Sequence, residues 1–165
     1  RGPQWDLLIA HLPCTYFANS GVWAFSKVPP NPSVGVKYGA DRWLAFDDAV
    51  NLWRAVWESP IPRKALENPT PHGKVTDSVG RYTQAIQPYD FGEDASKRTC
   101  LWLQHLPPLV PTRYVPPRLV DGKPRWGNQT DSGQNKLTPS ADRWKLRSRT
   151  YPGIAAAMAE QWGNL

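Results

Sequence analysis

The first seventy residues constrain the fold most, because two short strand-like segments flank one long amphipathic segment. Residues 5–10 (Trp-Asp-Leu-Leu-Ile-Ala) are a continuous apolar run, typical of a central parallel strand that is buried on both faces. Residues 41–58 carry apolar side chains at spacings of three and four, which predicts a helix with Asp41 as its N-cap. Residues 63–69 follow as a second strand. Together these segments predict a βαβ unit in an open, mostly parallel α/β sheet.

The remainder of the chain is limited by its proline content. It has 18 prolines among 165 residues, whereas average usage of about 5% gives about 8. We expect a single domain, 1–165, with an α/β core over 1–106, a long Pro-rich extended arm over 107–150 and a C-terminal helix over 151–165. Within this frame we expect a long loop over 15–40, a strand or helix end over 82–86, a strand over 99–103 and a helix from Pro152 to Trp162.

Composition narrows the class of protein. The longest apolar runs are too short for a membrane span, and no signal-peptide core is present, so we expect a soluble cytoplasmic protein with no membrane partner. Cys14 and Cys100 are the two cysteines; neither lies in a Cys-x-x-Cys pair, so we expect reduced thiols and no metal site. The net charge of +6 favours a polyanionic partner such as DNA. Cations interleave with aromatic residues in 140–151, as on surfaces that follow phosphates; a solvated basic helix face is the alternative.

Both predicted strands of the βαβ unit end in reactive side chains. The first leads into His11-Leu12-Pro13-Cys14, and the second ends in Glu67-Asn68-Pro69. Because ligands of open α/β sheets bind outside the carboxyl ends of the strands, we expect Cys14 and Glu67 to share one crevice. A thiol beside an acid suits a nucleophile that attacks an electrophilic ring or carbonyl whose developing charge the acid neutralises.

These segments resemble a known family. Residues 6–16 together with Asn19-Ser20-Gly21 resemble the Pro-Cys catalytic loop of DNA (cytosine-5) methyltransferases, and Glu67-Asn68-Pro69 is similar to that family's Glu-Asn-Val motif. Residues 89–92 followed by 97–102 are similar to a later segment in which a glycine turn precedes basic residues and a strand. The order of these pieces, with 87–89, 132–136 and the ending 142–163, resembles methyltransferase-like proteins of tailed bacteriophages and prophages over nearly the whole chain.

The resemblance implies a Rossmann-like, methyltransferase-type sheet and a mechanism in the cytoplasm of a bacterial host. Cys14 as thiolate would attack ring carbon 6 of a flipped cytosine, Glu67 would protonate ring nitrogen 3, and carbon 5 would take a methyl group from S-adenosylmethionine. The expected contacts to substrate or DNA come from Pro13, Asn68, Lys97, Arg98, Arg143, Arg147 and Arg149. Lys97, Arg98 and His11 are also candidates for the positive charge that favours the thiolate.

The sequence also departs from the family. Leu12 stands where a first proline is usual, Pro69 stands where valine is usual, and no Gly-x-Gly pattern for the methyl donor occurs. The cofactor-binding residues are therefore unknown. The chain is expected to be a fragment, one half of a split enzyme completed by a second polypeptide or by an N-terminal segment, or a relic with another role. Two alternatives stay open: a non-catalytic phage module that binds or protects DNA, and a cysteine hydrolase or deaminase that uses Cys14 with His11.

Overall fold

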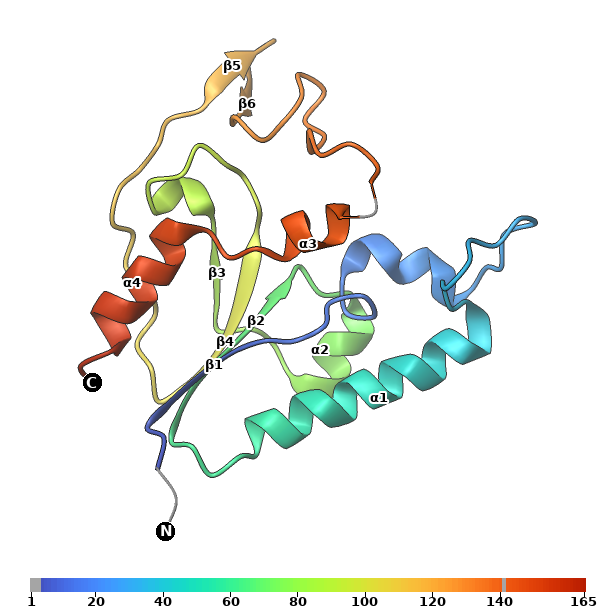
Figure 1. Ribbon diagram of the computed structural model, residues 1–165, viewed down its shortest axis with the longest axis horizontal. Coiled ribbons are helices and arrows are strands. Elements are labelled where there is room, and N and C mark those ends of the chain that lie inside the picture. The colour runs from blue at the N-terminus through green and yellow to red at the C-terminus, as the bar shows by residue number, and fades with distance from the viewer. Residues whose placement is uncertain (1–3, 141) are drawn as a thin grey trace. The chain divides into compact units, whose positions relative to one another are not determined.

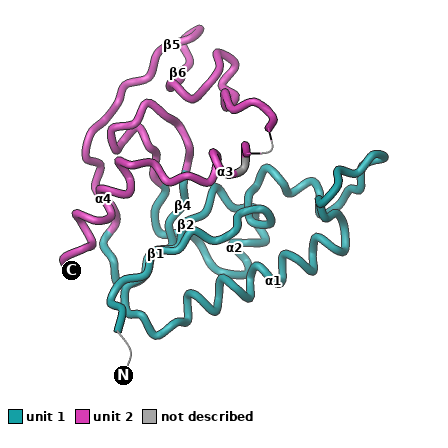
Figure 2. The backbone as a smooth tube through the Cα atoms, viewed as in Figure 1, with its two compact units in different colours: residues 1–85, 99–107 teal, residues 86–98, 108–165 magenta. Residues whose placement is uncertain are grey.

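The computed structural model describes residues 4–140 and 142–165, which fall into two compact units (Figure 2). Unit 1 comprises the chain up to Ala85 together with Thr99–Pro107, and unit 2 comprises Ile86–Arg98 and Pro108–Leu165. The two units are thus interleaved along the sequence, and each contains its own set of buried side chains.

A four-stranded mixed sheet follows the order β1-β2-β4-β3, with β1 at Leu7–His11, β2 at Arg63–Pro69, β3 at Gln84–Ile86 and β4 at Thr99–Gln104 (Figure 1). β1 and β2 are parallel, and β2 and β4 are antiparallel. The predicted α/β class and βαβ unit are confirmed, but the prediction of a mostly parallel sheet is wrong. The direction of β4 relative to β2 depends on the path of the chain between them. That path contains one short helix, α2 (Gly73–Val79), the strand β3 and the single turn η2 (Pro88–Asp90).

β1 is an edge strand of the described sheet, not the central strand that its apolar sequence predicts. Leu8 and Ala10 pack against the core, but Ile9 is 37% exposed and no residue of the strand is fully buried. Because alternate side chains of a strand point to opposite faces, β1 covers the core with one face and leaves the other partly open. An apolar run alone does not distinguish an edge strand from a central one.

The predicted helix is confirmed as α1, Gly39–Trp57. It begins two residues before the expected cap: Tyr38 is the N-cap and makes no side-chain cap bond, whereas Asp41 lies in the first turn. A carboxylate there still interacts favourably with the helix dipole. Phe46, Val50 and Trp53 are buried as predicted, while Trp43 lies at the rim, where it is 37% exposed.

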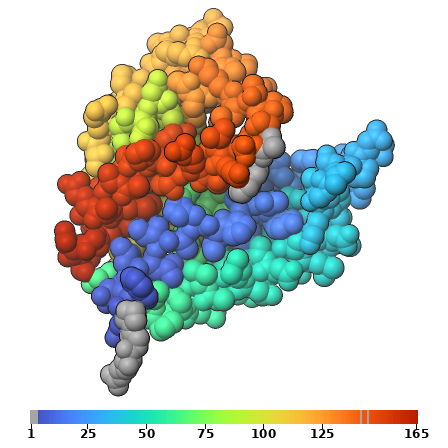
Figure 3. Space-filling view, in the orientation of Figure 1, coloured from blue at the N-terminus to red at the C-terminus, as the bar shows by residue number. Residues whose placement is uncertain are grey.

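The core of unit 1 is aromatic and lies between α1, the 3₁₀ helix η1 (Asn19–Phe25), α2 and the strands β2 and β4. Its most buried members include Phe17, Trp53, Leu66 and Trp102. The Trp102 indole Nε1–H donates to the Gly80 carbonyl oxygen at 3.0 Å, which pairs the polar atom of this buried ring. η1 lies in the region expected to be loop, and the segment between η1 and α1 protrudes from this unit (light blue in Figure 3).

Unit 2 contains a hairpin of β5 (Arg118–Val120) and β6 (Lys123–Arg125), then α3 (Arg143–Ser148) and α4 (Pro152–Trp162). The hairpin turns at Asp121 and Gly122, both with positive φ, as a two-residue turn of this kind requires. The α4 helix and its buried stripe of Ile154, Met158 and Trp162 are confirmed. The extended Pro-rich arm over 107–150 is not confirmed, because this range holds the hairpin, α3 and the buried Trp126.

Candidate active site

Glu67 and His11 meet where the parallel strands β1 and β2 end. The register pairs them directly across the two strands, so their side chains lie on the same face of the sheet. The His11 Nδ1–H donates to the Glu67 carboxylate oxygen Oε2. The Glu67 side chain is 15% exposed and the His11 side chain is 44% exposed. The predicted acid is therefore near the surface and already has an imidazole partner, for which the sequence offered no specific evidence.

Cys14 lies three residues after His11, in the loop that leaves β1. Cys14 is exposed, whereas Cys100 in β4 is fully buried. The Cys14 carbonyl oxygen accepts the main-chain N–H groups of Phe17 and Ala18 at 3.1 and 3.0 Å, so the loop closes immediately after the thiol. The described geometry thus gives the Cys14 thiol access to solvent on a well-bonded turn, as a nucleophile requires.

Two buried polar side chains hold this loop in place through hydrogen bonds to its main chain. Arg42 Nη2–H donates to the Thr15 carbonyl oxygen at 2.8 Å, and His72 Nε2–H donates to the Tyr16 carbonyl oxygen at 2.8 Å. Arg42 is 4% exposed and His72 is 2% exposed. Sequence reasoning missed both residues. Arg42 had one usable signal, since it lies four residues before Phe46 on the apolar stripe of the helix, where a cation must find buried acceptors.

Aromatic rings surround both of these side chains. The Arg42 guanidinium carbon lies 5.2 Å from the Tyr16 ring centroid and 4.9 Å from the Phe25 centroid. The His72 ring lies 5.1 Å from Phe25 and 5.5 Å from Phe46 between centroids. These contacts hold a desolvated cation against ring faces, an arrangement that stabilises it more than at an exposed site.

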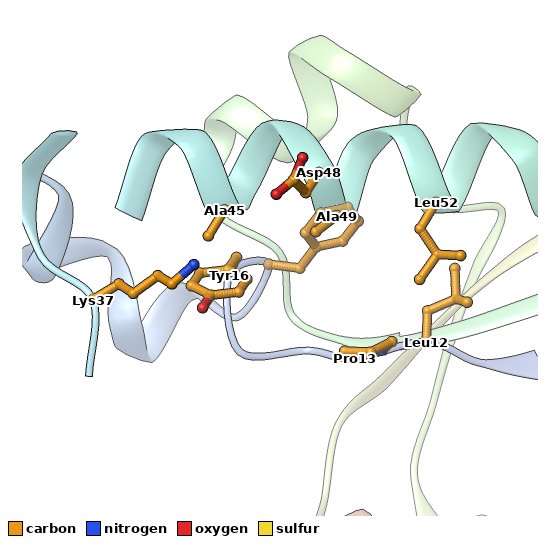
Figure 4. A pocket seen from close by; sticks show the side chains of 9 residues that line it. Leu12, Pro13, Tyr16, Lys37, Ala45, Asp48, Ala49 and Leu52 are labelled. Atoms are coloured by element: carbon orange, nitrogen blue, oxygen red, sulfur yellow. The ribbon is translucent and has the colours of Figure 1, made fainter. Parts of the chain in front are cut away.

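A cavity of about 250 Å³ lies between the loop and α1 (Figure 4). Leu12 and Pro13 line it from the loop, Ala45, Ala49 and Leu52 line it from α1, and the charged side chains of Lys37 and Asp48 also border it. Among its described lining residues are neither Cys14 nor Glu67. Pro13 therefore contributes to a mostly apolar cavity that the exposed Cys14 does not line.

Asn68 follows Glu67 in β2 and is 2% exposed. Alternation along the strand turns it away from Glu67, to the face that packs on α1 through Leu66. Neither polar atom of its side chain has a hydrogen-bond partner among the described residues. A buried amide without partners costs about 1–3 kcal/mol, so this position carries a local energetic penalty next to the predicted acid.

The predicted basic residues all lie in unit 2. Lys97 Nζ–H donates to the Arg149 carbonyl oxygen at 3.4 Å, and the same ammonium lies 6.0 Å from the Tyr151 ring centroid. Arg98, Arg147 and Arg149 are exposed, and Arg143 is half-buried at the start of α3. The structure thus brings Lys97 and Arg149 together, with Arg147 on the same short helix as Arg143.

Gly21 is the glycine nearest the Cys14 loop in sequence, and a Cβ there would lie 2.6 Å from Arg42 Nη2. The close approach at this glycine therefore serves a side chain of the protein. Within 4–140 and 142–165, no group of three or more His, Cys, Asp or Glu side chains is placed to hold a metal ion. No helix in the described part of the chain is both long and apolar enough to cross a membrane.

Comparison with known proteins does not assign the chain to a family. No protein-family model matches the chain, and no curated protein is significantly similar to it.

Proposed function

We propose that Cys14 and Glu67 form a nucleophile-and-acid site that adds covalently to a cytosine ring in DNA, as the catalytic half of a DNA (cytosine-5) methyltransferase-like enzyme. The observation that carries the proposal is an exposed thiol three residues after β1 and a mostly buried carboxylate in the last pair of the parallel β1–β2 ladder. That edge of a parallel pair is where ligands of open α/β sheets bind. The resemblance of 6–16 and 67–69 to the family's two motifs supports the same chemistry.

The exchange needs water as its one other reactant. The Cys14 thiolate forms a bond to ring carbon 6, the pair of the C5=C6 double bond forms a C4=C5 double bond, and the pair of the C4=N3 double bond takes the Glu67 proton at nitrogen 3. Carbon 5 then takes a proton from water, which leaves hydroxide. Hydroxide removes the original hydrogen of carbon 5 as a proton, nitrogen 3 returns its proton to Glu67, and the C5=C6 double bond re-forms as the thiolate leaves. Methyl transfer would need a donor site from a second polypeptide or an N-terminal segment.

His11 acts on this chemistry through Glu67. Its Nδ1–H bond fixes the orientation of the carboxylate, and a protonated imidazole offers a proton to replace the one that Glu67 transfers. His11 is therefore a positioning residue for the acid. Arg42 and His72 have the corresponding role for the loop that carries the thiol.

The test measures exchange of the carbon 5 hydrogen, which needs no methyl donor. DNA that carries tritium at carbon 5 of cytosine should release it to water with the wild-type chain. Cys14→Ser should abolish release, and Glu67→Gln should slow it by about 10²-fold or more, the usual range for a lost general acid. Cys100→Ala is the matched control, because that thiol is fully buried. Release that persists in Cys14→Ser, or no release above the DNA alone, overturns the proposal.

A non-catalytic DNA-binding role is the second candidate. It is favoured by the exposed Arg147 and Arg149 in a chain of net charge +6. Salt-sensitive retention on DNA that is the same in Cys14→Ser, together with no tritium release, would support this role.

A further inference from the structure

We propose that unit 2 contains a separate binding site for a nucleotide, that is, for a ligand with both an aromatic base and a phosphate group. The site is a cavity of about 480 Å³ whose described lining residues comprise Gly127, Asn128, Asn135, Lys136, Leu137, Leu146, Arg149, Thr150, Tyr151 and Pro152. Its volume is within the range of about 300–1,000 Å³ of small-ligand sites. The inference does not depend on Cys14 or Glu67.

The charge of the cavity selects an anion. Lys136 and Arg149 are the charged side chains among its described lining residues, and both are exposed. Two carboxylates are bonded to the main chain at or next to lining residues: Glu93 accepts the Gly153 N–H at 3.0 Å, and Asp94 accepts the Gly127 N–H at 2.7 Å. Neither carboxylate is among the described lining residues, so the charges that line the cavity favour a phosphate.

The walls of the cavity select a flat, partly polar ring. Tyr151 offers an aromatic surface, and Leu137, Leu146 and Pro152 are apolar. Base–aromatic stacking is tolerant of base identity, because every base has a flat π-face. Burial raises the pKa of the Tyr151 hydroxyl, so the phenol remains uncharged near neutral pH and does not repel a phosphate. A bare inorganic anion would leave this apolar and aromatic surface unused.

Amide groups at the cavity are held in place by the main chain. The Asn128 side chain accepts the Ser96 N–H and donates to the Ser96 carbonyl oxygen, each at 2.9 Å. Asn135 Oδ1 accepts the Leu137 N–H at 2.8 Å. The Lys136 N–H donates to the Asn128 carbonyl oxygen at 2.9 Å and ties the two sides of this loop together. Such preorganised groups are typical of polar contacts that orient a ligand.

The position of Lys97 supports Tyr151 and Arg149 from outside the cavity. Its ammonium lies over the Tyr151 ring and bonds the Arg149 carbonyl oxygen. A third cation close to the site strengthens the attraction for a phosphate, and its contact with the ring favours the observed orientation of Tyr151.

The experiment titrates the full chain with thymidine 5′-monophosphate and, in a second arm, with a fluorescent thymidine oligonucleotide, and it measures calorimetric heat or anisotropy. We expect saturable one-to-one binding in at least one arm. Lys136→Gln/Arg149→Gln should weaken it by about tenfold or more, the usual effect of lost hydrogen bonds to charged groups. Tyr151→Leu should weaken it and Tyr151→Phe should retain it. Lys74→Gln/Lys123→Gln removes the same charge from exposed residues outside the cavity and should leave binding unchanged.

Each outcome decides the matter. Binding of the free nucleotide identifies a soluble nucleotide as the source of the ligand, and binding of the oligonucleotide alone identifies a nucleic-acid strand. The proposal is overturned if neither ligand saturates, if inorganic phosphate competes as strongly as the nucleotide, or if the two double variants lose affinity equally. The tritium-release assay of the Cys14 site is independent of all these readings, so failure of one proposal is distinguishable from failure of the other.

Discussion

Arg42 is the residue on which the shape of the Cys14 loop depends most. It is buried, donates to the Thr15 carbonyl oxygen at 2.8 Å and to the Lys37 carbonyl oxygen at 3.3 Å, and contacts two aromatic rings. Arg42→Gln leaves these acceptors without their partner, so we expect the free energy of unfolding to fall by about 2–3 kcal/mol. Urea unfolding measures the change. Arg81→Gln, on an exposed arginine of the same unit, should change stability little, and equal losses in both variants would contradict the assigned role.

Asp90 makes stability depend on pH in an unusual direction. Burial raises the pKa of its carboxyl above the ordinary value of 3.8. The folded protein therefore binds this proton more tightly than the unfolded chain, and the contribution of Asp90 to stability is lost as pH rises through the raised pKa. Asp90→Asn should remove this loss and raise the melting temperature at pH 7 relative to wild type, with the difference shrinking below the ordinary pKa. Melting curves across acidic to neutral pH measure it, and a constant difference would contradict the assignment.

The candidate site was predictable from sequence to the extent that local order defines it. The positions of Cys14 and Glu67 follow from two strand ends, and the parallel pairing of those strands follows from the helix between them. The pairing of His11 with Glu67 depends on the register across 56 residues, which no local pattern specifies. The role of His72 in holding the Cys14 loop could not be predicted for the same reason. Its hydrogen bond to the Tyr16 carbonyl oxygen also joins residues that are 56 positions apart.

At the scale of elements, long periodic segments were predictable and sheet order was not. α1 and α4 follow from their apolar stripes, β4 follows from a short apolar run, and β2 follows from a short segment that ends at Pro69. β1 has the composition of a central strand but lies at the edge of the described sheet. The position of a strand depends on how all the strands pair, which its own composition does not specify. The helices α2 and η1 are short and lack the periodicity that identifies a helix, and tertiary contacts around Phe17 and Val75 stabilise them instead.

The start of α4 requires a glycine. A Cβ at Gly153 would collide with the main-chain oxygen of Phe91 in the same unit. Gly153→Ala must therefore displace backbone, and we expect a loss of about 1–3 kcal/mol, as for other overpacked sites. Gly73→Ala at the start of α2 is the matched control, since nothing lies within 4 Å of its Cβ position. That variant should be neutral or slightly stabilising. Thermal unfolding of both measures the contrast, and similar melting temperatures would contradict the predicted collision.

At the scale of the whole molecule, the two compact units share one chain that passes between them at Ala85–Ile86, Arg98–Thr99 and Pro107–Pro108. The segment Ile86–Arg98 of unit 2 thus runs in sequence from the last residue of β3 to the residue before β4. No single cut separates the units, so experiments on either proposed site require the full chain. The two proposed sites also differ in chemistry: a thiol and a carboxylate in unit 1, and cations around an aromatic ring in unit 2.

The net charge of +6 belongs to the whole molecule, but contact with DNA depends on where the cations lie. Each cation that touches a duplex phosphate adds about 0.9 to the log–log salt slope of binding. If Arg147 and Arg149 make such contacts, Arg147→Gln/Arg149→Gln should reduce the slope by about 1.8. Lys27→Gln/Lys74→Gln gives the same net charge, +6 minus 2 or +4, and should leave the slope unchanged. Filter binding to duplex DNA across a salt series measures both variants, and equal reductions would mean that overall charge, not these arginines, attracts the DNA.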